Sequence, residues 1–245
     1  FVAGGVTSSV LPASVAAKLT PRFTNWPRDA KTSSNQEMIY ADGGLMENLP
    51  LIPMLRRRVA KVVAFVNAEG SLAPADVWDP ATQPYDPKYM DDYVPGYFGV
   101  VPSGQFGYDT SRDQVFSKSE FARVVSELQA AMAKGKGAIA TTQLTTIENK
   151  WWGVSAGINV TVTWVYLTRL SAWESLLPDS VRQNVVPKQD PEDPQNSPTS
   201  GPFEYFPHYD DVEQTSLTVP QANLLADMTG WTIHANLDVF SAALS

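Results

Sequence analysis

The order of apolar and polar positions predicts a chain that mixes helices and strands. Two short apolar runs, Met38–Ala41 and Lys61–Val66, have the length and composition of buried strands. Between them, Leu49–Arg58 combines apolar positions with three arginines at its end, as is typical of a short helix. A strand, a turn, a helix and a second strand in this order suggest a parallel α/β sheet.

A second set of patterns follows further along the chain. Ser117–Lys134 is the clearest helix, with apolar residues on one face and with Ser117 and Glu120 at the spacing of a capping box. Ile158–Tyr166 alternates strictly, which predicts a strand with one face more polar than the other. Two more helices are expected, Leu170–Leu177 and Thr218–Trp231, the second with Thr218 as its N-cap.

Two long segments lack this periodicity. Residues 70–112 are rich in proline, glycine, tyrosine and aspartate, and a segment of that length is usually functional or wraps a surface. Residues 187–202 are acidic and proline-rich, which predicts a surface loop. No internal repeat divides the chain, so residues 1–245 are interpreted as part of one domain.

Composition narrows the classes of function. The 245 residues are 43% apolar and 18% charged, which is ordinary for a globular protein with a sizeable core. A net charge of −8 argues against nucleic acid as a partner, because nucleic-acid-binding proteins carry basic patches. There is no cysteine, and His208 and His234 are the only histidines, which leaves little room for a histidine-rich metal site, so we expect no metal.

Targeting signals are weak. The first twenty residues do not have the pattern of an intact signal peptide, and no compartment follows from the sequence. Trp151–Thr168 is uncharged over the length of a membrane span, but its alternating polar residues favour a strand.

One candidate nucleophile lies in Gly153–Gly157, which has the Gly-x-Ser-x-Gly pattern of the serine hydrolase elbow. That elbow follows a buried strand and opens a helix. Here no buried strand precedes the pattern and the strand from Ile158 follows it, so we interpret Ser155 as part of a strand-entry turn. A hydrolase that uses Ser155 with His208 or His234 remains as a weaker alternative.

A second candidate is Asp42, which follows the apolar run that ends at Ala41 and precedes Gly43 and Gly44. Enzymes with α/β folds place their chemistry at the carboxyl ends of such strands. Glycines let the backbone turn and let another group approach the carboxylate closely. The alternative interpretation is an ordinary Asp-Gly turn with Asn48 capping the next helix.

The segment Tyr40–Pro53 resembles the aspartate motif of the patatin and cytosolic phospholipase A2 superfamily. The likeness rests on Asp42-Gly43-Gly44 followed by Asn48-Leu49-Pro50 and a helix. Softer likenesses to lysophospholipase-like members occur at Phe206–Tyr209 and Gln221–Trp231, and the whole covers most of residues 36–231.

The resemblance implies a lipid acyl hydrolase of the phospholipase or lysophospholipase type. Its fold would have a mainly parallel central sheet with flanking helices, and this chain would be the C-terminal portion of the catalytic domain. Asp42 would be the general base of a Ser–Asp dyad, with Gly43, Gly44 and Asn48 supporting its turn. The substrate would be a phospholipid or another acyl-ester lipid, met in transient contact with a membrane surface, and no cofactor would be needed.

In that superfamily the nucleophile elbow precedes the aspartate, and only 41 residues precede Asp42 here without an elbow among them. The nucleophilic serine is therefore expected outside this chain, in an N-terminal portion of the same protein that is a separate chain or lies outside this sequence. The alternative is a catalytically incomplete domain that acts as a structural or binding subunit of a larger assembly.

Overall fold

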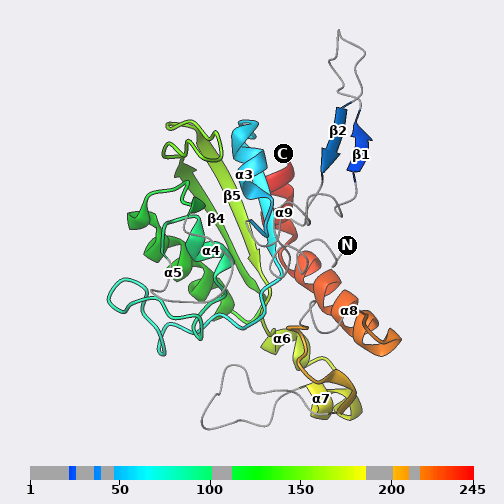
Figure 1. The fold of residues 1–245 in the computed structure, drawn as a ribbon. Helices are drawn as coiled ribbons and strands as arrows, with labels where there is room; N and C mark the ends of the chain where they lie inside the picture. The colour runs from blue at the N-terminus through cyan, green and yellow to red at the C-terminus, as the bar shows by residue number, and fades with distance from the viewer. Residues whose placement is uncertain (1–21, 26–35, 40–46, 101–111, 186–200, 210–215) are drawn as a thin grey trace. The chain divides into compact units, whose positions relative to one another are not determined.

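The computed structural model describes residues 22–25, 36–39, 47–100, 112–185, 201–209 and 216–245 (Figure 1). The chain divides into two compact units, Phe1–Asn48 and Leu49–Ser245, and each is described by itself. The described residues place the protein in the mixed α/β class that the sequence predicts.

The described part of the first unit is a pair of short strands. β1 (Arg22–Asn25) and β2 (Gln36–Ile39) pair antiparallel, with Arg22 opposite Ile39. We expected the run from Met38 to join Lys61–Val66 in a parallel unit, but β2 belongs to a separate sheet. β1 is closer to β2 in sequence than β5 is, so the loop that must close to pair β2 with β1 is shorter and costs less entropy.

The second unit contains a three-stranded mixed sheet in the order β3-β5-β4. β3 (Lys61–Val66) and β5 (Asn159–Tyr166) coincide closely with the predicted strands and pair parallel. β4 (Ala138–Thr145), which the sequence analysis did not predict, pairs antiparallel with β5. The described sheet is therefore mixed and not mainly parallel as we expected. The connection from β4 to β5 is short, which favours an antiparallel pair over a parallel crossover.

Helices surround this sheet, and most of them were expected. α3 matches the predicted helix before β3, and α6 and α8 match the two that follow β5, whereas α7 and α9 were not predicted. Their bounds are α3 Leu51–Arg56, α4 Tyr93–Gly96, α5 Phe121–Met132, α6 Ser171–Glu174, α7 Asp179–Val185, α8 Val219–Ala235 and α9 Leu237–Leu244, with single 3-10 turns at Lys118–Glu120 and Gly201–Phe203.

The two predicted helix starts have different outcomes. Thr218 is the N-cap of α8, as predicted. It also forms a reciprocal capping box with Gln221, which was not predicted. The box predicted at Ser117 is wrong: its hydroxyl hydrogen-bonds Ser119 at 2.8 Å. Glu120 instead forms an ion pair with Arg123, so its carboxylate does not reach back to the helix start.

The main core lies on the face of the sheet that α5 covers (Figure 1). Trp164 of β5 is fully buried there, with its ring centroid 6.3 Å from those of Tyr97 and Phe98. Its indole N–H donates to the Thr142 hydroxyl of β4 at 3.0 Å, so the ring is oriented as well as buried.

The long segment between β3 and α5 has little regular structure, as predicted from its composition, and residues 101–111 within it lie outside the described part. Its residues 72–98 supply aromatic side chains to the core, with Trp78 stacked on Tyr89 at 5.4 Å. Gln129 of α5 is buried and donates to the carbonyls of Ala73 and Trp78, both at 2.9 Å. The segment is thus held by packing and by hydrogen bonds from the helix.

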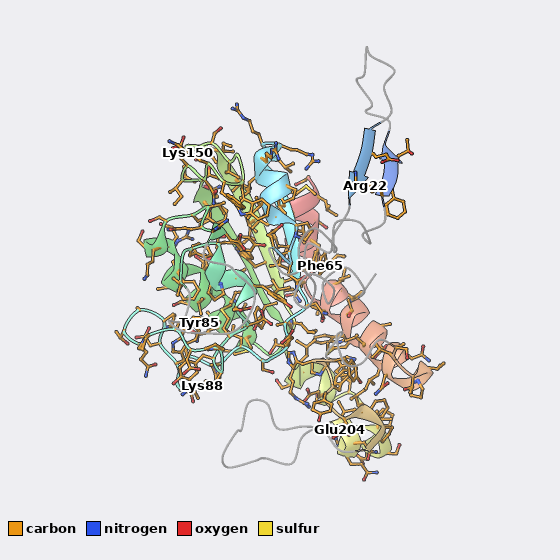
Figure 2. All side chains as sticks on the ribbon, in the orientation of Figure 1. Arg22, Phe65, Tyr85, Lys88, Lys150 and Glu204 are labelled. Atoms are coloured by element: carbon orange, nitrogen blue, oxygen red, sulfur yellow. The ribbon has the colours of Figure 1, made fainter. Side chains whose placement is uncertain are left out.

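The opposite face of the sheet is less completely covered. Phe65 of β3, which is labelled in Figure 2, is 54% exposed. Its ring stacks on that of Phe240 of α9, with the centroids 6.3 Å apart. Leu225 and Met228 of α8 join Phe65 in lining a mainly apolar cavity of about 180 Å³. In the described ranges, no helix is both long enough and apolar enough to cross a membrane.

Trp164→Ala is expected to lower the free energy of unfolding by about 3–5 kcal/mol, because it empties the centre of a close-packed core. The matched control is Trp151→Ala, which removes the same side chain where it is 59% exposed and should cost no more than about 1 kcal/mol. Urea unfolding followed by circular dichroism measures both values. Equal losses in the two variants would contradict this description of the core.

Candidate functional site

One group of hydrogen-bonded polar side chains lies where β3 and β5 end. The two strands run parallel, with Val66 opposite Tyr166, so their carboxyl ends lie side by side. This edge of an open α/β sheet is where ligands are commonly bound. Three segments meet there: residues 67–73 after β3, residues 89–93, and residues 206–209.

Ser71 and His208 form the closest pair of reactive side chains at this edge. The Ser71 hydroxyl lies 2.8 Å from His208 Nε2, although 137 positions separate the two residues. His208 Nδ1 lies 2.8 Å from the carbonyl oxygen of Ala68. Both Ser71 and His208 are partly buried, so the hydroxyl is neither freely solvated nor sealed in the core.

The carbonyl of Ala68 determines which nitrogen of His208 donates a hydrogen bond and which accepts one. A carbonyl oxygen only accepts, so His208 Nδ1 must carry the hydrogen. Burial lowers the pKa of His208 from 6.5 to about 4, and the positive charge of Arg169 acts in the same direction. The ring is neutral at pH 7, its Nε2 has a free lone pair, and Ser71 donates its hydroxyl hydrogen to that lone pair.

Asp91 is a buried carboxyl at the same edge of the sheet. Its two oxygens accept the backbone N–H groups of Glu69 at 2.8 Å and Tyr93 at 2.9 Å. Burial is the larger effect and raises the pKa of Asp91 from 3.8 to about 6, while those two hydrogen bonds oppose the rise. The group therefore titrates close to neutral pH.

Tyr166 joins the strand end to both neighbouring segments. Its hydroxyl donates to the carbonyl of Gly70 at 3.0 Å and accepts the backbone N–H of Asp91 at 2.9 Å. The side chain is fully buried, and burial followed by the charge of Asp91 raises its pKa well above 10. It is a fixed hydrogen-bond partner at neutral pH and not a proton donor to a substrate.

The positive charge of Arg169 acts on His208. It pairs with Glu174 at 2.9 Å, and both side chains are largely buried. Burial lowers the pKa of Arg169, whereas Glu174 opposes that shift. The negative charge of Glu174 thus offsets the positive charge of Arg169, which acts on the histidine.

The structure describes only one of the four predicted site residues, Asn48. Asp42, Gly43 and Gly44 lie outside the described residues. Asn48 is exposed in the bend before α3, whose N-cap is Pro50 with no side-chain capping bond. Asn48 therefore does not cap that helix, contrary to the simpler interpretation of the motif.

Ser155 has the surroundings that the sequence analysis predicts. It is exposed in the connection from β4 to β5, where Gly153 and Gly157 have φ values of 71° and 79°. Strand β5 follows it, where the serine hydrolase elbow would have a helix. His234 is exposed in the last turn of α8, and His208 bonds Ser71, so the described contacts give no support to a Ser155 triad.

Sequence reasoning missed Ser71, Asp91 and Tyr166 as members of one site. The available signal was the position of Ser71 and Asp91 in an aperiodic segment directly after a strand. His208 was considered only as a partner for Ser155. Within the described ranges, no three histidine, aspartate or glutamate side chains gather as metal ligands would.

Comparison with protein-family models, with curated protein sequences and with solved structures gave no match.

Asp91 and His208 should make opposite contributions to the pH dependence of stability. The raised pKa of Asp91 stabilises the fold below about pH 4, and this contribution is lost as pH rises through about 6. The lowered pKa of His208 stabilises the fold above pH 6.5, and this contribution is lost as pH falls towards about 4. Each contribution is on the order of 3 kcal/mol.

On acidification from pH 6.5 to 4, Asp91→Asn should therefore lose more stability than the unmodified chain, and His208→Gln should lose less. Urea unfolding across this pH range measures the three curves. Variants whose curves run parallel to that of the unmodified chain would contradict these assignments.

Proposed function

We propose that the protein is a lipid acyl hydrolase of the phospholipase or lysophospholipase type, with Asp42 as its general base. The observation that carries the proposal is the motif Asp42-Gly43-Gly44 followed by Asn48-Leu49-Pro50. The chain after that motif forms α3 and then β3, which is the order of elements that accompanies the motif in the patatin and cytosolic phospholipase A2 superfamily.

The proposed reaction needs no metal and no histidine. A serine attacks the ester carbonyl while Asp42 accepts its proton, the alcohol leaves with that proton, and an acyl-serine remains. Water then attacks the acyl-serine with Asp42 as base, which releases the fatty acid and restores the serine. Backbone N–H groups of a glycine-rich loop would stabilise the oxyanion.

The nucleophile is proposed to come from outside this chain. Ser155 is the one match to the elbow pattern that the sequence analysis found, and it is exposed in a turn without a following helix. An N-terminal portion of the same protein would supply the serine and the oxyanion loop.

The second unit has an apolar cavity of about 180 Å³ on the opposite face of the sheet, lined in part by Phe65, Leu225, Met228 and Ile233. This volume is below the roughly 300–1,000 Å³ of a typical ligand pocket, so the cavity would take only a short part of an acyl chain. Contact with a membrane surface would be transient and is part of the same proposal.

A second candidate function is that of a structural or binding subunit in a larger assembly. The observation that favours it is the exposure of Phe65 on β3, which stands at one edge of the described three-stranded sheet. A sheet edge with an exposed apolar ring is suited to burial against another chain.

Asp42→Asn, made in the full-length protein, is expected to reduce hydrolysis of a phospholipid or lysophospholipid by about 100-fold or more, because the amide cannot accept the serine proton. Ser155→Ala is the matched control and should keep full activity. Fatty acid release from mixed vesicles measures both.

Full activity in Asp42→Asn together with its loss in Ser155→Ala would reverse the assignment. Absence of hydrolysis in the unmodified full-length protein would leave the subunit function as the better description.

A further inference from the structure

The pair Ser71 and His208 has no part in the proposed Asp42 mechanism, yet its geometry is that of a nucleophile and its base. Hydrogen-bond reach between the two groups is the first requirement for such a pair, at roughly 2.6–3.2 Å. The Ser71–His208 distance of 2.8 Å meets it. The Ala68 carbonyl, also at 2.8 Å, orients the imidazole from its other nitrogen.

We propose that Ser71 is a second reactive nucleophile of this protein, with His208 as its general base, and that it accepts acyl groups from small neutral carboxylic esters. Three features of the described residues support this assignment: the direction of the hydrogen bonds, the position of Ser71 in the fold, and the charges around it.

The direction of the hydrogen bonds activates the hydroxyl. Because Nδ1 donates to Ala68, Nε2 is the acceptor, and the Ser71 hydrogen points at it before any substrate binds. In a serine triad a carboxylate orients the histidine; here a backbone carbonyl does so. A carbonyl stabilises the imidazolium less than a carboxylate would, so acyl transfer to Ser71 should be slow.

Ser71 lies where an open α/β sheet commonly binds its ligands. It lies beyond the carboxyl end of β3 and is partly exposed. Among the described residues, no acceptor is found for the backbone N–H groups of Ser71 and Leu72. Backbone donors beside a nucleophile are the groups that stabilise an oxyanion.

The charges around Ser71 bear on the substrate class. Arg169 acts on His208, but its charge is compensated by the ion pair with Glu174 at 2.9 Å. Glu69 is exposed two positions before Ser71, and the Asp91 carboxyl accepts the Glu69 N–H, so the uncompensated charge at this edge is negative and disfavours anionic head groups. A neutral ester meets no such barrier, which separates this site from the phospholipid chemistry proposed for Asp42.

The reaction balances without a co-reactant. The bond from Ser71 Oγ to the carbonyl carbon forms while the hydroxyl proton moves to His208 Nε2. The bond to the leaving alkoxide then breaks, and the alkoxide takes that proton from Nε2. Water adds in the second half with its proton passing through the same nitrogen, which releases the acid and restores Ser71.

A fluorophosphonate probe tests the proposal on the full-length protein. Ser71 Oγ forms a bond to phosphorus, fluoride leaves, and the proton is taken up by His208. Peptide mapping by mass spectrometry is expected to find the adduct on Ser71. Ser71→Ala should remove that adduct, and His208→Gln should slow its formation by about 100-fold, because glutamine can keep the hydrogen bonds but is not a base.

Two controls separate this site from the proposed function. Ser155→Ala should leave the Ser71 adduct unchanged. Asp42→Asn should remove labelling of the serine outside this chain that the Asp42 mechanism requires while the Ser71 adduct persists, so the two proposals fail independently.

The pH profile distinguishes a base from an anchoring residue. With a His208 pKa of about 4, the rate of Ser71 labelling should stay level from pH 8 to 5 and fall below that range. Absence of any adduct on Ser71, or an adduct that forms equally fast in His208→Gln, would overturn the proposal and leave the pair as a structural contact between the segments at 68–71 and 206–209.

Discussion

The parallel pairing of β3 with β5 is the constraint on which the described site depends. It places Val66 opposite Tyr166, so the chain leaving β3 passes the end of β5 within reach of one side chain. The Tyr166 hydroxyl then binds that chain at Gly70 and again at Asp91. A single buried phenol thus holds two irregular segments against the sheet, because its hydroxyl must find partners once it is removed from water.

Burial at this edge favours the uncharged form of both titratable groups. Removal from water raises the pKa of Asp91 and lowers that of His208, although one is an acid and the other a base. At pH 7 the imidazole of His208 is neutral and can accept a hydrogen bond from Ser71, whereas the carboxyl of Asp91 titrates at about pH 6. Burial therefore accounts both for the pH dependence of stability expected at this edge and for the protonation states of its two titratable groups.

Local patterns predicted the elements whose signals are local. α3, β3, β5 and α8 were found because apolar spacing and the Thr218 cap are contained in a few neighbouring residues. β4 was missed because alanine and threonine occupy much of it, and small residues give little contrast between its faces.

The helix starts at Ser117 and Thr218 have similar capping signals in the sequence, but only Thr218 forms the capping box. At Ser117 the hydroxyl of Ser119 and the ion pair between Glu120 and Arg123 compete with the predicted box. The site was harder still to predict, since Ser71 and His208 meet only through tertiary packing. For the same reason the role of Asp42, which lies outside the described residues, rests on its motif alone.

The buried amide of Gln129 has a consequence for how the molecule opens. It donates hydrogen bonds to the carbonyls of Ala73 and Trp78. The irregular segment after Ser71 therefore cannot separate from α5 unless both hydrogen bonds break. Backbone amides in this stretch, such as that of Ala73, should then exchange their hydrogens together with the amides of α5 and not as those of an independent loop. A segment without regular secondary structure can in this way belong to the same cooperative unit as the helix that covers it.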